Sequence, residues 1–229
     1  MNAIQASSPV AQIVADHPAC AKVFADTKID FCCHGDVVLA DACAARGIDI
    51  EDVLARLRTV ATSEAPSDAP AIGIESSTAE LVAHLVSRHH AYLRRTLPAL
   101  EPLVAKVARV HGAHASELRE LFEEFHELRA ELEPHLDDEE ADLFPMLMSR
   151  APDRARLASR LAEAREEHRR VGRALTRIRV LAHDFRVPDW ACGSYRMMMS
   201  ELAAFEEDTL RHVHIENHVL MPRFDAPVS

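Results

Sequence analysis

Apolar residues recur every three to four positions from residue 78 to the region of Phe224, which is the spacing of one face of an α-helix. The pattern predicts four long helices, near residues 78–109, 115–149, 153–183 and 189–221. Turn-forming residues separate them, at Gly112-Ala113, Ala151-Pro152-Asp153 and Val187-Pro188-Asp189. Because such short connections make consecutive helices antiparallel, we expect an up-down four-helix bundle. We also expect four prolines to bend or interrupt these helices: Pro98, Pro102, Pro134 and Pro145.

The first 60 residues carry shorter helical patterns, which favour a small separate domain. Asp49 can cap the last of these helices, through Leu57. Residues 61–76 are rich in Ala, Ser, Pro and acidic residues without periodicity, which is typical of a linker. The sequence Ser77-Thr78-Ala79-Glu80 is a capping-box pattern and begins the bundle domain, residues 77–224. The expected fold is therefore all-α: a small helical domain (1–60), a linker and a four-helix bundle.

Composition narrows the class of protein. Of 229 residues, 26 are Lys or Arg and 37 are Asp or Glu, so the formal net charge is −11. General nucleic-acid binding needs a basic face, so we expect no nucleic-acid partner. We also expect no secretory signal and no membrane-spanning helix, since no apolar run reaches about 18 residues. The five cysteines are odd in number and lack the spacing of a disulfide framework, so we expect reduced thiols and a cytoplasmic location.

Histidine is unusually frequent, with 14 residues. In the second and fourth predicted helices the apolar stripe is interrupted by a histidine followed four residues later by a glutamate. The stripes are Leu121, Phe125, Leu128, Leu132, His135, Glu139, and Tyr195, Met198, Leu202, Phe205, Thr209, His212, Glu216. The first and third helices each place one histidine in the same phase, His90 and His168. All six residues are therefore expected to face the interior of the bundle.

Six inward-facing imidazoles and carboxylates indicate a metal centre. Burying a bare carboxylate costs several kcal/mol unless something compensates its charge. Four histidines and two glutamates are too many ligands for one tetrahedral zinc, and the mixture suits a pair of iron or manganese ions. The other histidines near this stripe are out of phase, and we expect them to be solvated or to lie around the ligands: His84, His89, His126, His214 and His218. His111, near the end of the first helix, is a candidate for the entrance of the site.

These residues resemble the iron–sulfur cluster repair di-iron proteins, the repair of iron centres family, and their hemerythrin-like HHE cation-binding domain. The matching segments are Arg88-His89-His90, Val110-His111-Gly112, His135 to Glu140 with Leu143-Phe144-Pro145, Glu167-His168, His212 to Asn217 with Leu220-Met221-Pro222-Arg223, and Asp30-Phe31-Cys32-Cys33-x-Gly35. The resemblance implies two iron ions per chain, held by His90, His135, Glu139, His168, His212 and Glu216. It implies that the two glutamates and an oxo or hydroxo group bridge the irons.

The chain departs from the family at two positions. His34 replaces a glycine often found after the paired cysteines, and Pro134 directly precedes a ligand, which puts the thiol chemistry and the course of that helix in question.

The paired cysteines Cys32 and Cys33 are the second candidate site. A disulfide between neighbours is strained, because the two Cα atoms are only about 3.8 Å apart across a trans peptide. We therefore interpret the pair as reactive thiols, with a redox or iron-transfer role, or as transient metal ligands; two inert buried cysteines are the alternative. His34 beside them can stabilise a thiolate. The remaining cysteines are interpreted as small apolar residues: Cys20, Cys43 and Cys192.

The resemblance implies repair of iron–sulfur clusters damaged by nitric oxide or oxidants, with damaged iron–sulfur proteins as partners and nitric oxide or dioxygen as small ligands. Two alternatives stay open: an enzyme that reduces nitric oxide at the same irons, and a module that senses or stores dioxygen or iron without turnover. The sequence leaves open the identity of the metal, the electron donor and the oligomeric state.

Overall fold

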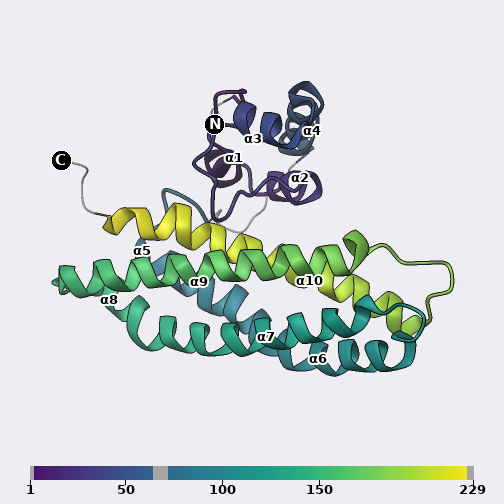
Figure 1. The fold of residues 1–229 in the computed structure, drawn as a ribbon. Coiled ribbons are helices and arrows are strands. Elements are labelled where there is room, and N and C mark those ends of the chain that lie inside the picture. The colour runs from purple at the N-terminus through teal and green to yellow at the C-terminus, as the bar shows by residue number, and fades with distance from the viewer. Residues whose placement is uncertain (1–2, 64–71, 226–229) are drawn as a thin grey trace. The chain divides into compact units, whose positions relative to one another are not determined.

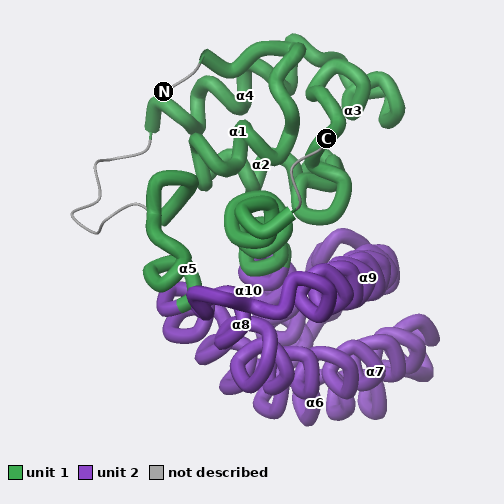
Figure 2. The backbone as a smooth tube through the Cα atoms, turned by 90° about the vertical axis from the view of Figure 1, so that its left-hand side faces the viewer, with its two compact units in different colours: residues 1–82, 210–229 green, residues 83–209 purple. Residues whose placement is uncertain are grey.

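A computed structural model describes residues 3–63 and 72–225. It divides into two compact units, residues 1–82 with 210–229 and residues 83–209 (Figure 2). The described residues form helices and contain no β-strand; one isolated bridge joins Pro9 and Val38. The all-α expectation is thus confirmed. Within the described ranges, no helix combines the length and the apolar character needed to cross a membrane.

The unit of residues 83–209 consists of long helices that run up and down beside one another (Figure 1). They are α6 (Ala91–His111), α7 (Glu117–Asp138), α9 (Arg154–Leu181) and the first part of α10 (Gly193–His214). Their apolar stripes meet in a buried core, in which the rings of Phe125 and Phe205 lie 5.6 Å apart. The four-helix bundle expected from the sequence is therefore present, because each amphipathic face finds its partner.

The ends of the four predicted helices agree with the structure to within four residues, but three of the helices are composites. Three of them contain a π-helical segment: η1 (Leu85–His90) between α5 (Thr78–His84) and α6, η2 (Glu139–Leu143) between α7 and α8 (Phe144–Met148), and η4 (Ile215–Leu220) after α10. A short 3₁₀ turn, η5 (Met221–Phe224), ends the fourth. Three of the four prolines do not interrupt a helix, since α6 runs through Pro98 and Pro102 and α7 runs through Pro134. Pro145 lies at the start of α8, where the π-helical segment η2 interrupts the regular helix.

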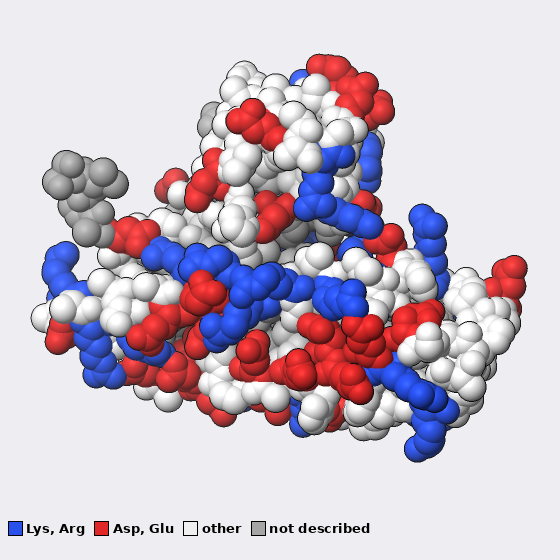
Figure 3. All heavy atoms as spheres, viewed as in Figure 1, with Lys and Arg blue, Asp and Glu red and all other residues white. Residues whose placement is uncertain are grey.

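Charged side chains of both signs gather on the face of this bundle that Figure 3 shows. Arginines of α9 pair with glutamates of α7, as in Arg170–Glu131 (3.4 Å) and Arg177–Glu120. Such exposed pairs contribute little to stability, but their alternation is consistent with α7 and α9 being neighbours. The start of α9 is capped by Asp153, whose carboxylate accepts hydrogen bonds from the backbone N–H groups of Ala155 and Arg156.

The other unit contains four short helices, α1 (Val10–Asp16), α2 (Cys20–Thr27), α3 (Leu39–Arg46) and α4 (Ile50–Ser63). They share a core with Val213 of α10, and its largest fully buried side chains are Phe24, Phe31, Leu39 and Leu57. Asp49 caps α4, accepting a hydrogen bond from the N–H of Glu51 at 2.9 Å, but the helix continues to Ser63 rather than ending near Leu57. The hydroxyl groups of its last turn bond back to carbonyls one turn earlier, which lets these polar residues stay helical.

The predicted capping box at the start of α5 is confirmed. The N–H of Ser77 donates to Glu80 at 2.7 Å, and the N–H of Glu80 donates to the hydroxyl of Ser77 at 3.2 Å. Residues 64–71, inside the predicted linker 61–76, lie outside the described residues.

Candidate metal centre

Three of the predicted ligands lie in the π-helical segments. His90 ends η1, Glu139 begins η2 and Glu216 lies in η4. A π turn inserts an extra residue into the helical repeat, so it redirects side chains, and such turns are frequent at functional sites. The hydrophobic pattern of the sequence did not predict these π-helical segments. The sequence contains a signal for two of them, because Pro145 and Pro222 each lie six residues after a predicted ligand glutamate, and proline cannot donate the regular helical hydrogen bond.

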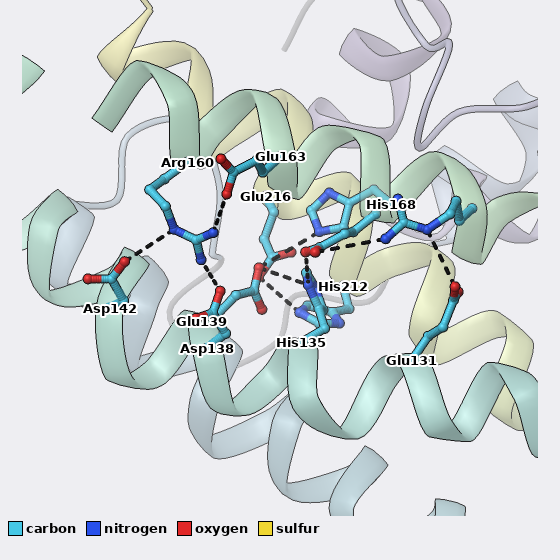
Figure 4. Close-up of polar contacts among 12 residues, drawn as sticks. Glu131, His135, Asp138, Glu139, Asp142, Arg160, Glu163, His168, His212 and Glu216 are labelled. Atoms are coloured by element: carbon cyan, nitrogen blue, oxygen red, sulfur yellow. Dashed lines mark hydrogen bonds and ion pairs between the residues drawn. The ribbon is translucent and has the colours of Figure 1, made fainter. Parts of the chain in front are cut away.

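Glu139 faces three of the predicted ligand histidines, of which His135 and His168 are labelled with it in Figure 4. Its carboxylate is 1% exposed, and three imidazole Nε2 atoms face it. Oε1 lies 3.3 Å from His135 and 3.8 Å from His168, while Oε2 lies 3.4 Å from His90. One oxygen of this buried carboxylate thus faces two histidines, and the other oxygen faces the third.

Two further carboxylates orient the histidines from outside. Nδ1 of His90 lies 2.9 Å from Glu140, and Nδ1 of His135 lies 2.8 Å from Glu167. The His135 bond lowers the pKa of Glu167. Partial burial favours the neutral form of Glu140, but hydrogen bonds from His90 and Arg94 outweigh this effect and lower the pKa of Glu140.

An ionised acceptor at Nδ1 favours the tautomer that carries its proton there, which leaves the Nε2 lone pair directed at Glu139. A lone pair that faces a buried carboxylate is a repulsive arrangement, and a cation between them relieves it. The same carboxylate–histidine arrangement is typical of metal sites. The donor set therefore fits a bound cation.

Arg160 of α9 stabilises the neighbouring part of α7 and η2 (Figure 4). It forms ion pairs with Asp138, Asp142 and Glu163, the last two at 3.2 and 2.5 Å. These contacts hold α9, which carries His168, beside the turn that begins at Glu139.

His212 and Glu216, the remaining predicted ligands, belong to the other unit. Both are fully buried, and Nε2 of His212 lies 2.9 Å from Oε1 of Glu216. They continue the buried stripe of α10 without a break in the helix, following Phe205 and Thr209. This histidine and glutamate, one turn apart and fully buried, are the last two of the six predicted ligands.

The histidines that lie outside the phase of the apolar stripe differ from one another in their surroundings. His126 is exposed and bonds to Glu101. His89 and His214 are buried rather than solvated: His89 pairs with Asp208 at 3.1 Å, and His214 contacts the carbonyl of Phe31. Burial lowers the pKa of His214 to about 4.

The expectation that His111 lies at the entrance of the centre is wrong. His111 ends α6, about 30 Å along the helix from His90 at about 1.5 Å per residue. There its Nε2 lies 3.2 Å from Sγ of Cys192, and its ring packs against Trp190 and Tyr195.

The paired cysteines lie in a turn held by Asp30. Its Oδ1 accepts hydrogen bonds from the N–H groups of Cys32 (3.0 Å) and Cys33 (2.9 Å). None of the five cysteines, all of which lie in the described ranges, forms a disulfide. Nδ1 of His34 lies 2.7 Å from Oδ2 of Asp30, the other oxygen of the same carboxylate. The hydrogen bond with Cys33, burial and the charge of Asp30 raise the pKa of Cys32 well above its usual value, so the expected stabilisation of a thiolate by His34 does not apply to Cys32.

The fold and the buried His/Glu cluster define a helical cation-binding protein. Residues 81–224 match the hemerythrin HHE cation binding domain, and residues 6–61 match a domain of unknown function, DUF542. The chain is 32% identical to the iron–sulfur cluster repair protein YtfE of Pectobacterium carotovorum, over 90% of this chain and 91% of the relative. It is 30% identical to the iron–sulfur cluster repair protein ScdA of Staphylococcus epidermidis, over 93% and 96%. The "probable iron-sulfur cluster repair protein" of Haemophilus influenzae is 29% identical, over 95% and 96%. The chain belongs to this iron–sulfur cluster repair family.

Proposed function

We propose that His90, His135, Glu139, His168, His212 and Glu216 hold two iron ions bridged by the two glutamates and by an oxo or hydroxo group. One observation carries this proposal: Oε1 of Glu139 faces His135 and His168, while Oε2 faces His90. A carboxylate whose two oxygens serve different histidines is suited to bridging two cations. The continuous helix from α10 into η4 supports assigning His212 and Glu216 to the same centre.

The function that this centre supports best is repair of damaged iron–sulfur clusters in client proteins. The support is the family, whose members carry that function in their names, together with the cation-binding domain. In this proposal the chain supplies iron to the damaged cluster or handles nitric oxide, with nitric oxide or dioxygen as small ligands. We propose that the chain consists of a small helical domain (1–60), a linker (61–76) and the bundle domain (77–224). We also propose a cytoplasmic location, which is supported by five cysteines that form no disulfide.

Metal analysis with Mössbauer spectroscopy tests the centre. We expect two iron ions per chain with the signature of a coupled pair. A single iron, or zinc, in protein purified without added metal would contradict the proposal.

A reconstitution assay tests the function. A purified iron–sulfur enzyme whose cluster has been damaged by nitric oxide is incubated with the iron-loaded chain, and recovery of its activity is measured. We expect recovery with the unaltered chain and with a His126→Ala control, because His126 is exposed and outside the cluster. We expect no recovery with His135→Ala. Equal recovery with both variants would show that this centre has no role in repair.

A further inference from the structure

A second cluster of metal-binding side chains lies in the cysteine turn. Asp30, Cys32 and Cys33 each offer one ligand atom, and these atoms lie within 4.8 Å of one another. The two Sγ atoms are 3.5 Å apart, and Sγ of Cys32 lies 3.4 Å from Oδ1 of Asp30. Two sulfur atoms and one carboxylate oxygen this close together can supply three ligands to one metal ion.

The backbone of this turn is fixed by contacts on both sides. Asp30 holds the N–H groups of both cysteines. On the other side, the carbonyl of Cys32 accepts hydrogen bonds from Asn217 (2.8 Å) and His218 (3.0 Å). The donor atoms are thus positioned before any cation arrives, which reduces the ordering cost of binding.

The charges of the turn favour a cation. Burial opposes ionisation of Asp30, but bonds from Cys33, His34 and Cys32 outweigh it and lower its pKa, so the carboxylate is charged at neutral pH. Cys33 and Asp30 lie close to the buried Cys32 thiol and disfavour a thiolate there in the absence of metal. A bound divalent cation would neutralise the negative charge that these three groups bring together. Cys33 and Asp30 are partly exposed, so the turn is open to solvent on one side.

We propose that Asp30, Cys32 and Cys33 form a second metal site, which binds a thiophilic divalent cation through two thiolates and one carboxylate. Each binding event releases two protons, one from each thiol, and no electron is transferred. Thiolates select the softer metals over magnesium and calcium. If the chain is an iron donor, as proposed above, iron(II) is the cation bound in the cell, and this site binds the iron before it passes to the client protein.

The position of the turn supports this role. Asn217 and His218 belong to η4, the segment that also carries Glu216, and they hold the carbonyl of Cys32 directly. The thiolate site is thus attached to the segment that carries one of the proposed bridging glutamates. This step alone rests on the proposed function; binding of a cation by the turn does not.

Cobalt(II) is a suitable probe, because thiolate ligation gives a charge-transfer absorption that histidine and carboxylate ligands do not give. The metal-free full-length chain is titrated with cobalt(II) under reducing, anaerobic conditions. We expect the thiolate band in the unaltered chain and in His135→Ala, whose substitution affects only the histidine–glutamate centre. We expect the band to be lost in Cys33→Ser and Cys32→Ser, and the affinity to fall by about tenfold or more in Asp30→Asn.

Cys192→Ser is the matched control, since Cys192 is an exposed thiol outside any cluster of three donors found among the described residues. Circular dichroism shows whether each variant folds, and the half-buried Cys33 provides a variant that remains informative if Cys32→Ser unfolds. An absent band in the unaltered chain, or an unchanged band in a folded Cys33→Ser variant, would overturn the proposal. Cluster repair by the same iron-loaded Cys33→Ser variant is measured in parallel, so that failure of the thiolate site is distinguished from failure of the repair function.

Discussion

Glu140 lies 2.9 Å from Nδ1 of His90, although fifty positions separate the two residues in the chain. The opposite nitrogen of the same ring faces Glu139. Consecutive glutamates of η2 therefore have different surroundings: Glu139 faces the predicted ligand histidines, and Glu140 favours one tautomer and orientation of His90.

Replacing Glu140 with glutamine should weaken iron retention. The amide is a poorer acceptor than a carboxylate, so Nε2 of His90 becomes less basic and the ring is less firmly held. Loss of such an outer carboxylate typically reduces metal affinity by about 10- to 100-fold. Competition with a coloured iron chelator measures this affinity. Glu120→Gln, an exposed residue at the start of α7 paired with Arg177, is the control and should retain iron as the unaltered chain does.

Replacing Glu139 with glutamine should have opposite effects with and without metal. In the metal-free protein the buried carboxylate is costly, so the neutral amide should raise Tm, by about 2–4 °C for each kcal/mol gained. In iron-loaded protein the same substitution should lower Tm, because a proposed bridging ligand is lost. Thermal unfolding of both forms, with a Glu133→Gln variant at a half-buried position outside the cluster as control, measures this. A change of the same sign in both forms would show that no cation is bound by Glu139.

Gly35 should not tolerate a side chain. A Cβ there would lie 2.5 Å from Cβ of Ala11 and 2.6 Å from the carbonyl oxygen of Phe31, and overpacking of this kind typically costs about 1–3 kcal/mol. Gly35→Ala should therefore destabilise the cysteine turn and speed hydrogen exchange in residues 30–36. Gly193→Ala is the control, since nothing lies within 4 Å of its added Cβ. Equal exchange in the two variants would show that the close approach of α1 to this turn is not required.

Glu101 should make the bundle sensitive to acid. Hydrogen bonding to His126, and then the charge of Arg129, lower its pKa below 4.5. A carboxylate with a lowered pKa in the folded state contributes stability above its unfolded pKa, and this is lost as the pH falls through the folded value. In metal-free protein, Glu101→Gln should therefore lower the urea midpoint more at pH 6 than at pH 3.5. Equal losses at both values would indicate that the Glu101 contacts contribute through packing alone.

Much of the fold and of the candidate ligand set follows from the sequence. The 3.6-residue periodicity predicts the four long helices, and Ser77 and Glu80 mark the start of the first one. The same periodicity singles out His135 and Glu139, because an ionisable pair in an apolar stripe must be buried together and compensated. These predictions rely on local spacing, which the sequence contains in full.

Other features depend on contacts between distant parts of the chain. The π turns bring His90 and Glu139 into position, the two oxygens of Glu139 face different histidines, and Glu140 reaches back to His90. Asn217 and Cys32 are 185 positions apart, yet the side chain of one holds the carbonyl of the other. Periodicity determines which face of a helix is buried. Which atoms meet on that face is decided by packing, because a hydrogen bond or a metal ligand requires atomic positions that only the folded chain defines.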